Sequence, residues 1–229
     1  MGKGAIITID GPAGAGKSTV GRRLAQSLHY LYLDSGSLYR AVAWQAGRLG
    51  LDLSDSAALA AFLPGFRPEL RADGTGFHLL IDNHEVREEI RTPEVSRGSS
   101  LVAKLPVVRQ WVTEHLRWLA RNGGVVADGR DQGTAVFPEA EFKFYLDAAL
   151  RTRARRRLND WQKNDHPPTL EVVMRELAAR DLQDKTREAA PLQIPDGATV
   201  IDTTDLTVDE VSSLCLTHIR GPRQGNRNK

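Results

Sequence analysis

A glycine-rich stretch near the amino terminus constrains the fold more than any other feature of the chain. GPAGAGKS, residues 11–18, matches the pattern G-x-x-x-x-G-K-[ST] at every fixed position. It follows the apolar run 5–10, which predicts a buried strand, and leads into residues 17–28, whose apolar spacing predicts a helix. Glycines let backbone N–H groups approach an anion closely, and the amino-terminal end of the helix adds positive charge. We therefore predict a site for the phosphates of a nucleoside triphosphate.

Two side chains of this stretch have predicted roles in that site. Lys17 would reach the β- and γ-phosphates, and the hydroxyl of Ser18 would bind Mg²⁺. The strand before the loop and the helix after it make a chance glycine-rich turn the weaker alternative. The motif does not distinguish a kinase from a GTPase or an ATPase, so the reaction has to be read from other segments.

The rest of the chain mostly alternates short apolar runs with helical patterns, which predicts an α/β fold. Strands are predicted at 5–10, 31–33, 124–128, 142–146 and 198–202. Alternation with crossovers of this length predicts a mainly parallel sheet covered by helices. Residues 66–86 break the pattern, because short apolar runs there are separated by turn residues. This is typical of a small antiparallel sheet, inserted as a segment of roughly 40 residues.

Composition limits the compartment and the partners that we expect. The formal net charge is +2, which is too mild to indicate a nucleic-acid or membrane partner. Cys215 is the single cysteine, which excludes an internal disulfide and fits a reducing compartment. The sequence shows no targeting signal and no apolar run long enough to span a bilayer. We expect a cytoplasmic protein.

Residues 151–157, RTRARRR, carry five arginines in seven positions. One interpretation is a solvated helix face, as in most charged runs. The other is a mobile cover whose guanidinium groups neutralise the phosphoryl group during transfer. Nucleic-acid binding is a third interpretation, but the interleaved aromatic residues typical of such surfaces are few.

Two further segments carry candidate site residues. In GVVADGRDQGT, residues 124–134, a buried strand ends at Asp128, which would meet the metal or its water, and Arg130 would meet a second phosphate. The alternative is a turn that uses Asp and Gly for backbone reasons. In LDSGSLYR, residues 33–40, Ser35 precedes a helix and could serve as its cap, with Tyr39 and Arg40 one turn further on.

Five segments in this order together resemble the bacterial-type cytidylate kinases: ITIDGPAGAGKST, LDSGSLYR, EIRTPEV, ADGRDQGTAVFP and RDLQDKTREAAPL. The resemblance runs from about Ile6 to about Thr204. It implies a nucleoside monophosphate kinase with the P-loop NTPase fold. This fold would have a five-stranded parallel core sheet, an arginine-bearing helical lid and a monophosphate-binding domain enlarged by the antiparallel sheet.

The resemblance also implies a division of residues 1–229, taken as a single nucleoside monophosphate kinase unit. The core would comprise 1–34, 105–150 and 190–229, and the monophosphate-binding region 35–104. The lid would be 151–170, with a returning helix at 171–189.

The activity implied by the resemblance is transfer of the γ-phosphoryl group of ATP to CMP or dCMP, with Mg²⁺ as cofactor and Ser18 and Asp128 as its ligands. The implied ATP-binding residues are Gly11, Pro12, Ala13, Gly14, Ala15, Gly16, Lys17, Ser18 and Thr19. The implied CMP-binding residues are Ser35, Tyr39, Arg40, Ser100, Arg109, Arg130, Asp131, Arg180, Asp184 and Arg187. The implied catalytic residues are Lys17, Arg130, Arg155 and Arg187, where Arg155 is chosen from the middle of the arginine run.

No general base is needed for this reaction, because a phosphate monoester with a second pKa of ~6 is ionised near pH 7. We expect a monomer with small-molecule substrates and neither a nucleic-acid nor a membrane partner. Two alternatives stay open. One is another small phosphate-loop kinase, such as a uridylate or shikimate kinase. The other is a nucleotide-dependent switch or RNA-binding module that uses the arginine clusters and the tail 221–229.

Overall fold

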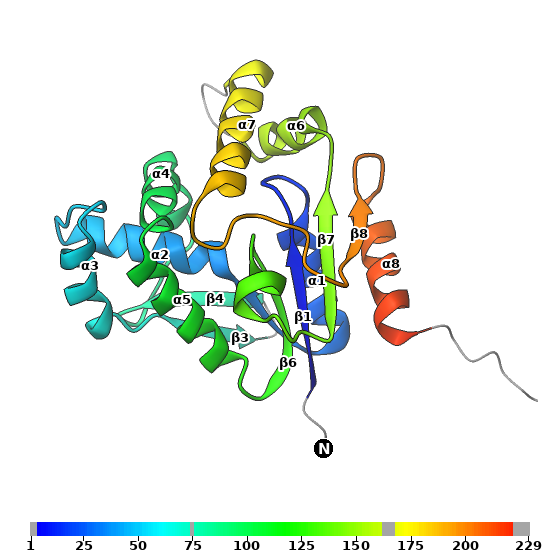
Figure 1. Cartoon of the computed structure of the whole chain (residues 1–229), viewed down its shortest axis with the longest axis horizontal. Coiled ribbons are helices and arrows are strands. Elements are labelled where there is room, and N and C mark those ends of the chain that lie inside the picture. The colour runs from blue at the N-terminus through cyan, green and yellow to red at the C-terminus, as the bar shows by residue number, and fades with distance from the viewer. Residues whose placement is uncertain (1–3, 74–75, 162–167, 222–229) are drawn as a thin grey trace, which may run out of the picture. The chain divides into compact units, whose positions relative to one another are not determined.

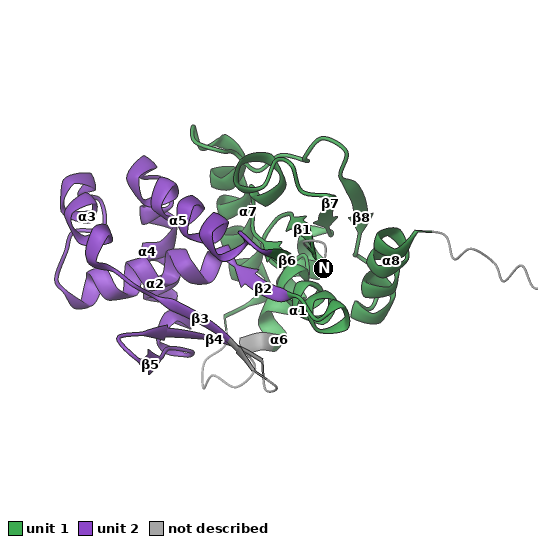
Figure 2. Cartoon of the chain, turned by 90° about the horizontal axis from the view of Figure 1, so that it is seen from below, with its two compact units in different colours: residues 1–30, 123–229 green, residues 31–122 purple. Residues whose placement is uncertain are grey.

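The computed structural model describes residues 4–73, 76–161 and 168–221. Three predicted features therefore lie wholly or partly outside the described residues: the turn at 74–75, the loop 162–167 of the predicted lid and the tail 222–229. Contacts between Cα atoms divide the chain into two compact units. Unit 1 combines residues 1–30 with 123–229, and unit 2 is residues 31–122 (Figure 2).

A parallel sheet of five strands forms the centre of the fold, as predicted (Figure 1). In their order in the sheet the strands are β2 (Leu31–Asp34), β6 (Gly123–Asp128), β1 (Gly4–Asp10), β7 (Phe142–Asp147) and β8 (Thr199–Asp202). Strand β1 pairs in parallel with both β6 and β7, and Ile9 lies opposite Asp128 in the register. The carboxyl ends of β1 and β6 therefore lie side by side, where ligands bind in open α/β sheets.

Unit 1 covers its strands with helices whose bounds agree closely with the sequence pattern. These helices are α1 (Lys17–Leu28), α6 (Leu150–Trp161), α7 (Leu170–Thr186) and α8 (Val208–Arg220). Val20 and Leu24 of α1 are buried, as their spacing predicts. The π-helical turn η3 (Gln132–Val136) after β6 was not predicted.

Unit 2 contains the predicted small antiparallel sheet. Its strands are β3 (Glu69–Asp73), β4 (Gly76–Ile81) and β5 (His84–Glu85). Asp82 and Asn83 join β4 to β5 with φ angles of 51° and 62°, which a two-residue hairpin turn requires. The first strand begins three residues later than the Phe66 that we predicted, because the Phe66 ring stacks on Trp111 at a centroid distance of 5.4 Å.

The helices of unit 2 extend further along the chain than the predicted monophosphate-binding region. They are α2 (Ser35–Arg48), α3 (Ser56–Phe62), the short 3₁₀ helices η1 (Leu63–Gly65) and η2 (Glu89–Arg91), α4 (Pro93–Val102) and α5 (Pro106–Leu119). We had assigned α5 to the core, but it belongs to unit 2, where it packs against α2 and α3. Its apolar stripe, with Val108, Val112 and Leu116 buried, explains this packing.

Helix α8 begins with the capping box that the sequence predicts. The hydroxyl of Thr207 accepts a hydrogen bond from the backbone N–H of Glu210 at 3.3 Å. The carboxylate of Glu210 in turn accepts one from the backbone N–H of Thr207 at 2.8 Å. Two backbone donors at the helix start are thus satisfied by side chains. Within the described ranges, no helix is long and apolar enough to cross a membrane.

Replacing the cap should measurably destabilise the protein. For Thr207→Ala we expect the free energy of unfolding to fall by about 1 kcal/mol, because the hydroxyl acceptor is lost. Urea denaturation followed by circular dichroism measures the change. Ser213→Ala, on the exposed face of the same helix, is the matched control, and it should change stability by less than about 0.5 kcal/mol. Equal stabilities of the two variants would show that the box contributes nothing.

Candidate active site

The loop between β1 and α1 adopts a backbone that requires glycine. Gly11 has φ 143°, and a Cβ there would lie 2.0 Å from the carbonyl oxygen of Leu146. Gly16, the residue before α1, is left-handed with φ 90°. Such a loop, followed by a free helix amino terminus, forms the anion site that the motif predicts.

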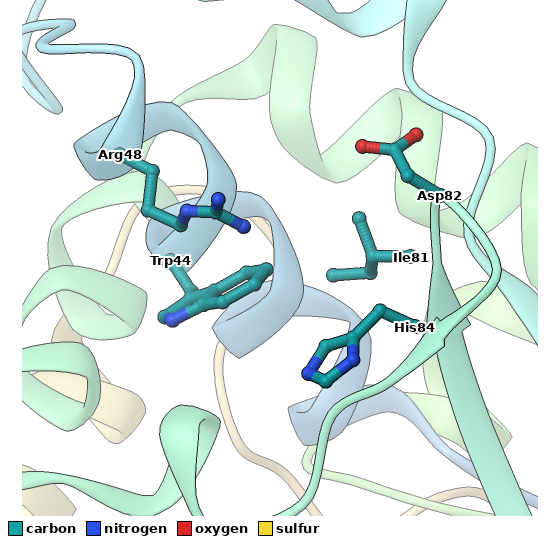
Figure 3. A pocket seen from close by; sticks show the side chains of 5 residues that line it. All are labelled: Trp44, Arg48, Ile81, Asp82 and His84. Atoms are coloured by element: carbon teal, nitrogen blue, oxygen red, sulfur yellow. The ribbon is translucent and has the colours of Figure 1, made fainter.

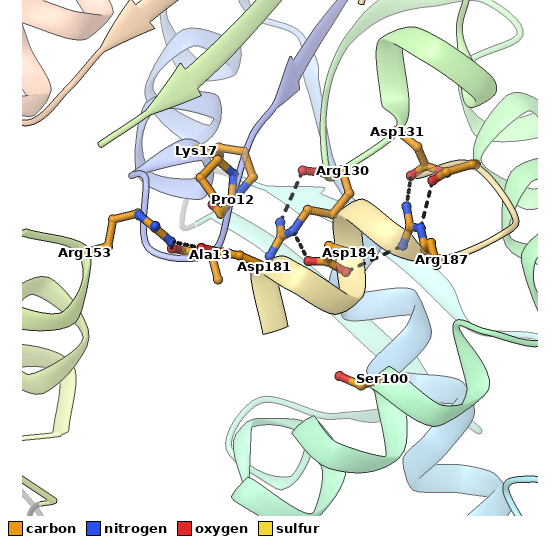
Figure 4. A network of polar contacts seen from close by, with 12 residues as sticks. Pro12, Ala13, Lys17, Ser100, Arg130, Asp131, Arg153, Asp181, Asp184 and Arg187 are labelled. Carbon is orange, nitrogen blue, oxygen red and sulfur yellow. Dashed lines mark hydrogen bonds and ion pairs between the residues drawn. The ribbon is translucent and has the colours of Figure 1, made fainter. Parts of the chain in front are cut away.

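The side chain of Lys17 is buried within this loop, with only 6% of its surface exposed. Its ammonium group donates a hydrogen bond to the carbonyl oxygen of Pro12 at 2.8 Å (Figure 4). Burial lowers the pKa of Lys17, and the nearby positive charge of Arg130 lowers it further. The negative charges of Asp128 and Asp10 oppose this shift in pKa. A bound phosphate would add negative charge where the protein holds a desolvated cation.

Four predicted CMP-binding residues gather in a charged cluster in unit 1. The Arg130 Nε donates to Asp184 Oδ2 at 2.8 Å, and Arg187 lies 3.7 Å from both Asp184 and Asp131 (Figure 4). Burial alone would lower the pKa of Arg130, but the charge of Asp184 outweighs it and raises that pKa. Burial likewise opposes the charged form of Asp184, yet Arg130 and Arg180 hold its pKa below the usual value. The predicted residue Arg180 therefore belongs to the same electrostatic cluster.

The arginine run on α6 divides into residues with different environments. Arg153 is 6% exposed, and its guanidinium donates to the carbonyl oxygen of Ala13 at 3.1 Å and to Asp181 at 2.6 Å. Arg153 therefore ties α6 to the glycine-rich loop and to α7. Arg155, the residue predicted to contact the transferred phosphoryl group, is exposed.

Arg156 provides a second link between α6 and the loop. Its guanidinium donates to the carbonyl oxygen of Thr203 at 2.5 Å and to the Thr203 hydroxyl at 3.0 Å. That hydroxyl donates in turn to the carbonyl oxygen of Ala15 at 3.1 Å. Two of the five arginines thus anchor the root of the predicted lid on the phosphate loop.

Several buried polar residues of the site were missed by sequence reasoning: Asp10, Arg153, Asp181 and Thr203. Asp10 is the most buried of them, with no exposed surface, and each of its carboxylate oxygens accepts a backbone N–H. Burial raises the pKa of Asp10 to about 7. A charged residue in the otherwise apolar run 5–10 was the signal that could have singled it out.

The two residues predicted to bind Mg²⁺ lie on elements that meet at the phosphate loop. Asp128 ends β6 and is 2% exposed, and Ser18 lies in the first turn of α1. The described residues hold no group of three or more His, Cys, Asp or Glu side chains suited to a metal. A carboxylate and a hydroxyl fit Mg²⁺, which usually takes one or two carboxylates and completes its shell with phosphates and water.

Unit 2 assembles its own predicted residues around the start of α2. Ser35 is the first residue of this helix, and the cap is Asp34, whose carboxylate accepts from the Ser37 N–H at 3.0 Å. The alternative that Ser35 caps the helix is therefore wrong. Asp34 also pairs with Arg40 at 3.0 Å.

Tyr39 and Arg109 also come together within unit 2. The guanidinium carbon of Arg109 lies 5.8 Å from the centre of the Tyr39 ring, within cation–π range. Arg109 is 7% exposed and donates to the carbonyl oxygen of Ala103 at 3.2 Å. Ser100 is half-buried, and its hydroxyl donates to the carbonyl oxygen of Ser96 at 3.3 Å. The predicted base-reading residues Ser100 and Arg109 thus lie in unit 2, and Asp131 lies in unit 1.

A pocket of about 490 Å³ lies elsewhere in unit 2 and is lined by Trp44, Arg48, Ile81, Asp82 and His84 (Figure 3). The guanidinium of Arg48 covers the Trp44 ring at 4.6 Å from its centre. None of the predicted site residues lines this pocket. We therefore place the candidate active site at the phosphate loop, where the buried charges gather.

A parallel α/β sheet with a glycine-rich phosphate loop, a buried loop lysine and a clustered set of arginines defines a phosphate-loop kinase. The family model for cytidylate kinase matches residues 7–221. The cytidylate kinase of Symbiobacterium thermophilum is 47% identical over 217 residues, covering 94% of this chain and 96% of the relative. That of Geobacillus kaustophilus is 45% identical over 205 residues, covering 90% and 92%. The chain belongs to the cytidylate kinase family and is an enzyme of that class.

One solved structure supports the fold alone. An uncharacterized protein from Eubacterium ventriosum superposes with a TM-score of 0.51 at 11% identity, covering 95% of this chain and 99% of that protein.

Removing the loop ammonium should weaken nucleotide binding and leave the fold intact. For Lys17→Ala we expect ATP affinity to fall by about tenfold or more, since a charge-assisted contact to phosphate is lost. Titration calorimetry measures the affinity, and circular dichroism checks the fold. Lys185→Ala, at an exposed position of α7, is the matched control. Unchanged ATP affinity in folded Lys17→Ala would contradict the assignment of the loop.

Proposed function

We propose that the protein transfers the γ-phosphoryl group of ATP to CMP or dCMP, giving ADP and CDP or dCDP. The observation that carries this proposal is the buried Lys17 in a glycine-rich loop, in a chain of the cytidylate kinase family. Residues Gly11–Thr19 hold ATP in this proposal. The enzyme works in pyrimidine nucleotide metabolism in the cytoplasm, acts as a monomer on small molecules, and binds neither nucleic acid nor membrane.

The transfer proceeds in line and without a general base. The attacking oxygen belongs to the phosphate of CMP, whose second pKa of ~6 leaves it ionised near pH 7. Catalysis then consists of positioning and of neutralising the charge on the transferred group. Lys17, Arg130 and Arg187 supply that charge, and their burial supports this role because charges act more strongly away from water.

Two further parts complete the proposed transfer. Ser18 and Asp128 hold Mg²⁺, which neutralises the phosphates of ATP when bound. The lid, residues 151–170 with the returning helix 171–189, brings Arg155 to the transferred group and excludes water. The exposed position of Arg155 supports this role, because Arg153 and Arg156 are already occupied with the phosphate loop.

Recognition of CMP is shared among several side chains. Ser35, Tyr39 and Arg40 face the monophosphate, and Arg180 and Asp184 meet the sugar hydroxyls. Ser100, Arg109 and Asp131 read cytosine: the Asp131 carboxylate accepts from the exocyclic amine, and Arg109 donates to the base carbonyl. Uracil carries a carbonyl in place of that amine, so it would face the carboxylate unfavourably.

A panel of acceptors tests the proposed reaction. Release of ADP from ATP and Mg²⁺ is followed in the presence of CMP, dCMP, UMP, AMP, GMP or shikimate. We expect kcat/KM to be highest for CMP or dCMP. Equal or better turnover of any of the other acceptors would contradict the proposal, and so would binding of RNA without CMP-dependent consumption of ATP.

A substitution at the base-reading carboxylate tests the source of specificity. For Asp131→Ala we expect the ratio of kcat/KM for CMP over UMP to fall by at least about tenfold, since a buried acceptor for the amine is lost. Asp205→Ala, at an exposed loop position, is the matched control and should keep the ratio. An unchanged ratio in Asp131→Ala would remove this residue from base recognition.

A further inference from the structure

Asp10, the last residue of β1, is bonded in a way that the reaction itself does not explain. Its side chain has no exposed surface. Oδ1 accepts the backbone N–H of Gln132 at 2.7 Å, and Oδ2 accepts that of Gly133 at 2.7 Å. Because both oxygens are occupied by backbone donors, Asp10 is not placed to accept a proton from a substrate.

The two bonded N–H groups belong to the first turn of η3, which begins directly after Asp131. A residue at the position of Asp131 commonly caps the following turn with its own side chain. Here Asp131 makes no such capping bond, although its carbonyl oxygen accepts from Ala135 and Val136 at 2.9 and 3.1 Å. Asp10 satisfies the turn from the neighbouring strand instead. The carboxylate of Asp131 is thereby turned toward Arg187, at 3.7 Å (Figure 4).

The same turn is packed against β1 without spare room. A Cβ on Gly133 would lie 2.9 Å from the Thr8 hydroxyl and 2.8 Å from Pro195 Cγ. At the other end of the segment, the Gly129 N–H donates to the carbonyl oxygen of Ile9 at 3.1 Å. The four residues 129–132, which include Arg130 and Asp131, are thus held to the end of β1 at both ends.

We propose that Asp10 is a positioning residue for base recognition, which fixes the turn after Asp131 so that the Asp131 carboxylate keeps one orientation toward its ligand. This inference rests on the proposed function, because Asp131 is its base-reading residue. The buried carboxylate is maintained against desolvation, which raises the pKa of Asp10 to about 7, and the two amide bonds oppose that shift.

Asp10→Asn is the first test, because it keeps the shape and replaces one acceptor by an amide that cannot accept an N–H. We expect the ratio of kcat/KM for CMP over UMP to fall by about tenfold, as for loss of one hydrogen bond to a charged group. The KM for ATP should stay within about twofold of the parent value, since the loop keeps its own contacts.

Thr8→Val is the matched control for Asp10→Asn. Thr8 lies two residues earlier on β1, is fully buried, and faces the same turn. Its hydroxyl has no hydrogen-bond partner among the residues that the structure describes. This variant should keep the CMP-over-UMP ratio, whereas a loss equal to that of Asp10→Asn would reduce Asp10 to a general packing role and overturn the inference.

Gly133→Ala approaches the turn from its other side and keeps the inference testable if Asp10→Asn does not fold. The added methyl group meets Thr8 and Pro195, so the turn has to shift while Asp10 and Lys17 are unchanged. We expect the same fall in CMP-over-UMP ratio with the KM for ATP preserved. An unchanged ratio in either folded variant would overturn the inference.

Hydrogen exchange separates this inference from the proposed function. In Asp10→Asn, but not in Thr8→Val, the amides of residues 129–137 should exchange faster than in the parent protein, with or without substrate. Faster exchange in a parent enzyme that does not phosphorylate CMP would overturn the proposed function and, with it, the base-reading role of the turn. An unchanged exchange rate in a parent enzyme that is active on CMP would overturn the positioning role alone.

Discussion

The carboxyl end of β1 is the point on which the nucleotide-binding part of the chain depends. Within two residues the backbone makes two demands there. Asp10 holds the turn after Asp131 by both of its carboxylate oxygens, and Gly11 passes so close to Leu146 that no side chain fits. The phosphate loop and the segment of Arg130 and Asp131 therefore start from one rigid position, although they are far apart in the sequence.

The charges gathered at this position make sense as a binding site and less as a source of stability. Lys17, Arg130 and Arg187 are desolvated beside Asp128, Asp131 and Asp184. Buried ion pairs seldom stabilise a fold more than apolar side chains of the same size, because desolvation costs about as much as pairing returns. Their value lies in being organised before the phosphates arrive, so that little rearrangement is needed during transfer.

The sequence predicted those parts of the fold that depend on local pattern. The strand 5–10, the loop and the helix 17–28 follow from apolar spacing and glycine, and the capping box at Thr207 from a four-residue signature. It did not predict the turn 132–136, because its amides are bonded to Asp10, 122 residues away in the chain. The arginine run looked uniform in sequence, and only tertiary contacts distinguish Arg153 and Arg156, which anchor α6, from the exposed Arg155. Helix α5 was assigned to the wrong unit because an apolar stripe says that a helix packs but not on what.

The central claim is that the phosphate loop presents a phosphoryl group to a nucleotide acceptor and not to water. A single-turnover experiment tests it most directly, with enzyme in excess over ATP that is radiolabelled at the γ-phosphate, in the presence or absence of CMP. We predict that with CMP the label appears in the β-phosphate of CDP, and that without CMP the ATP stays intact. Release of the label as inorganic phosphate at the same rate with and without CMP would contradict the account.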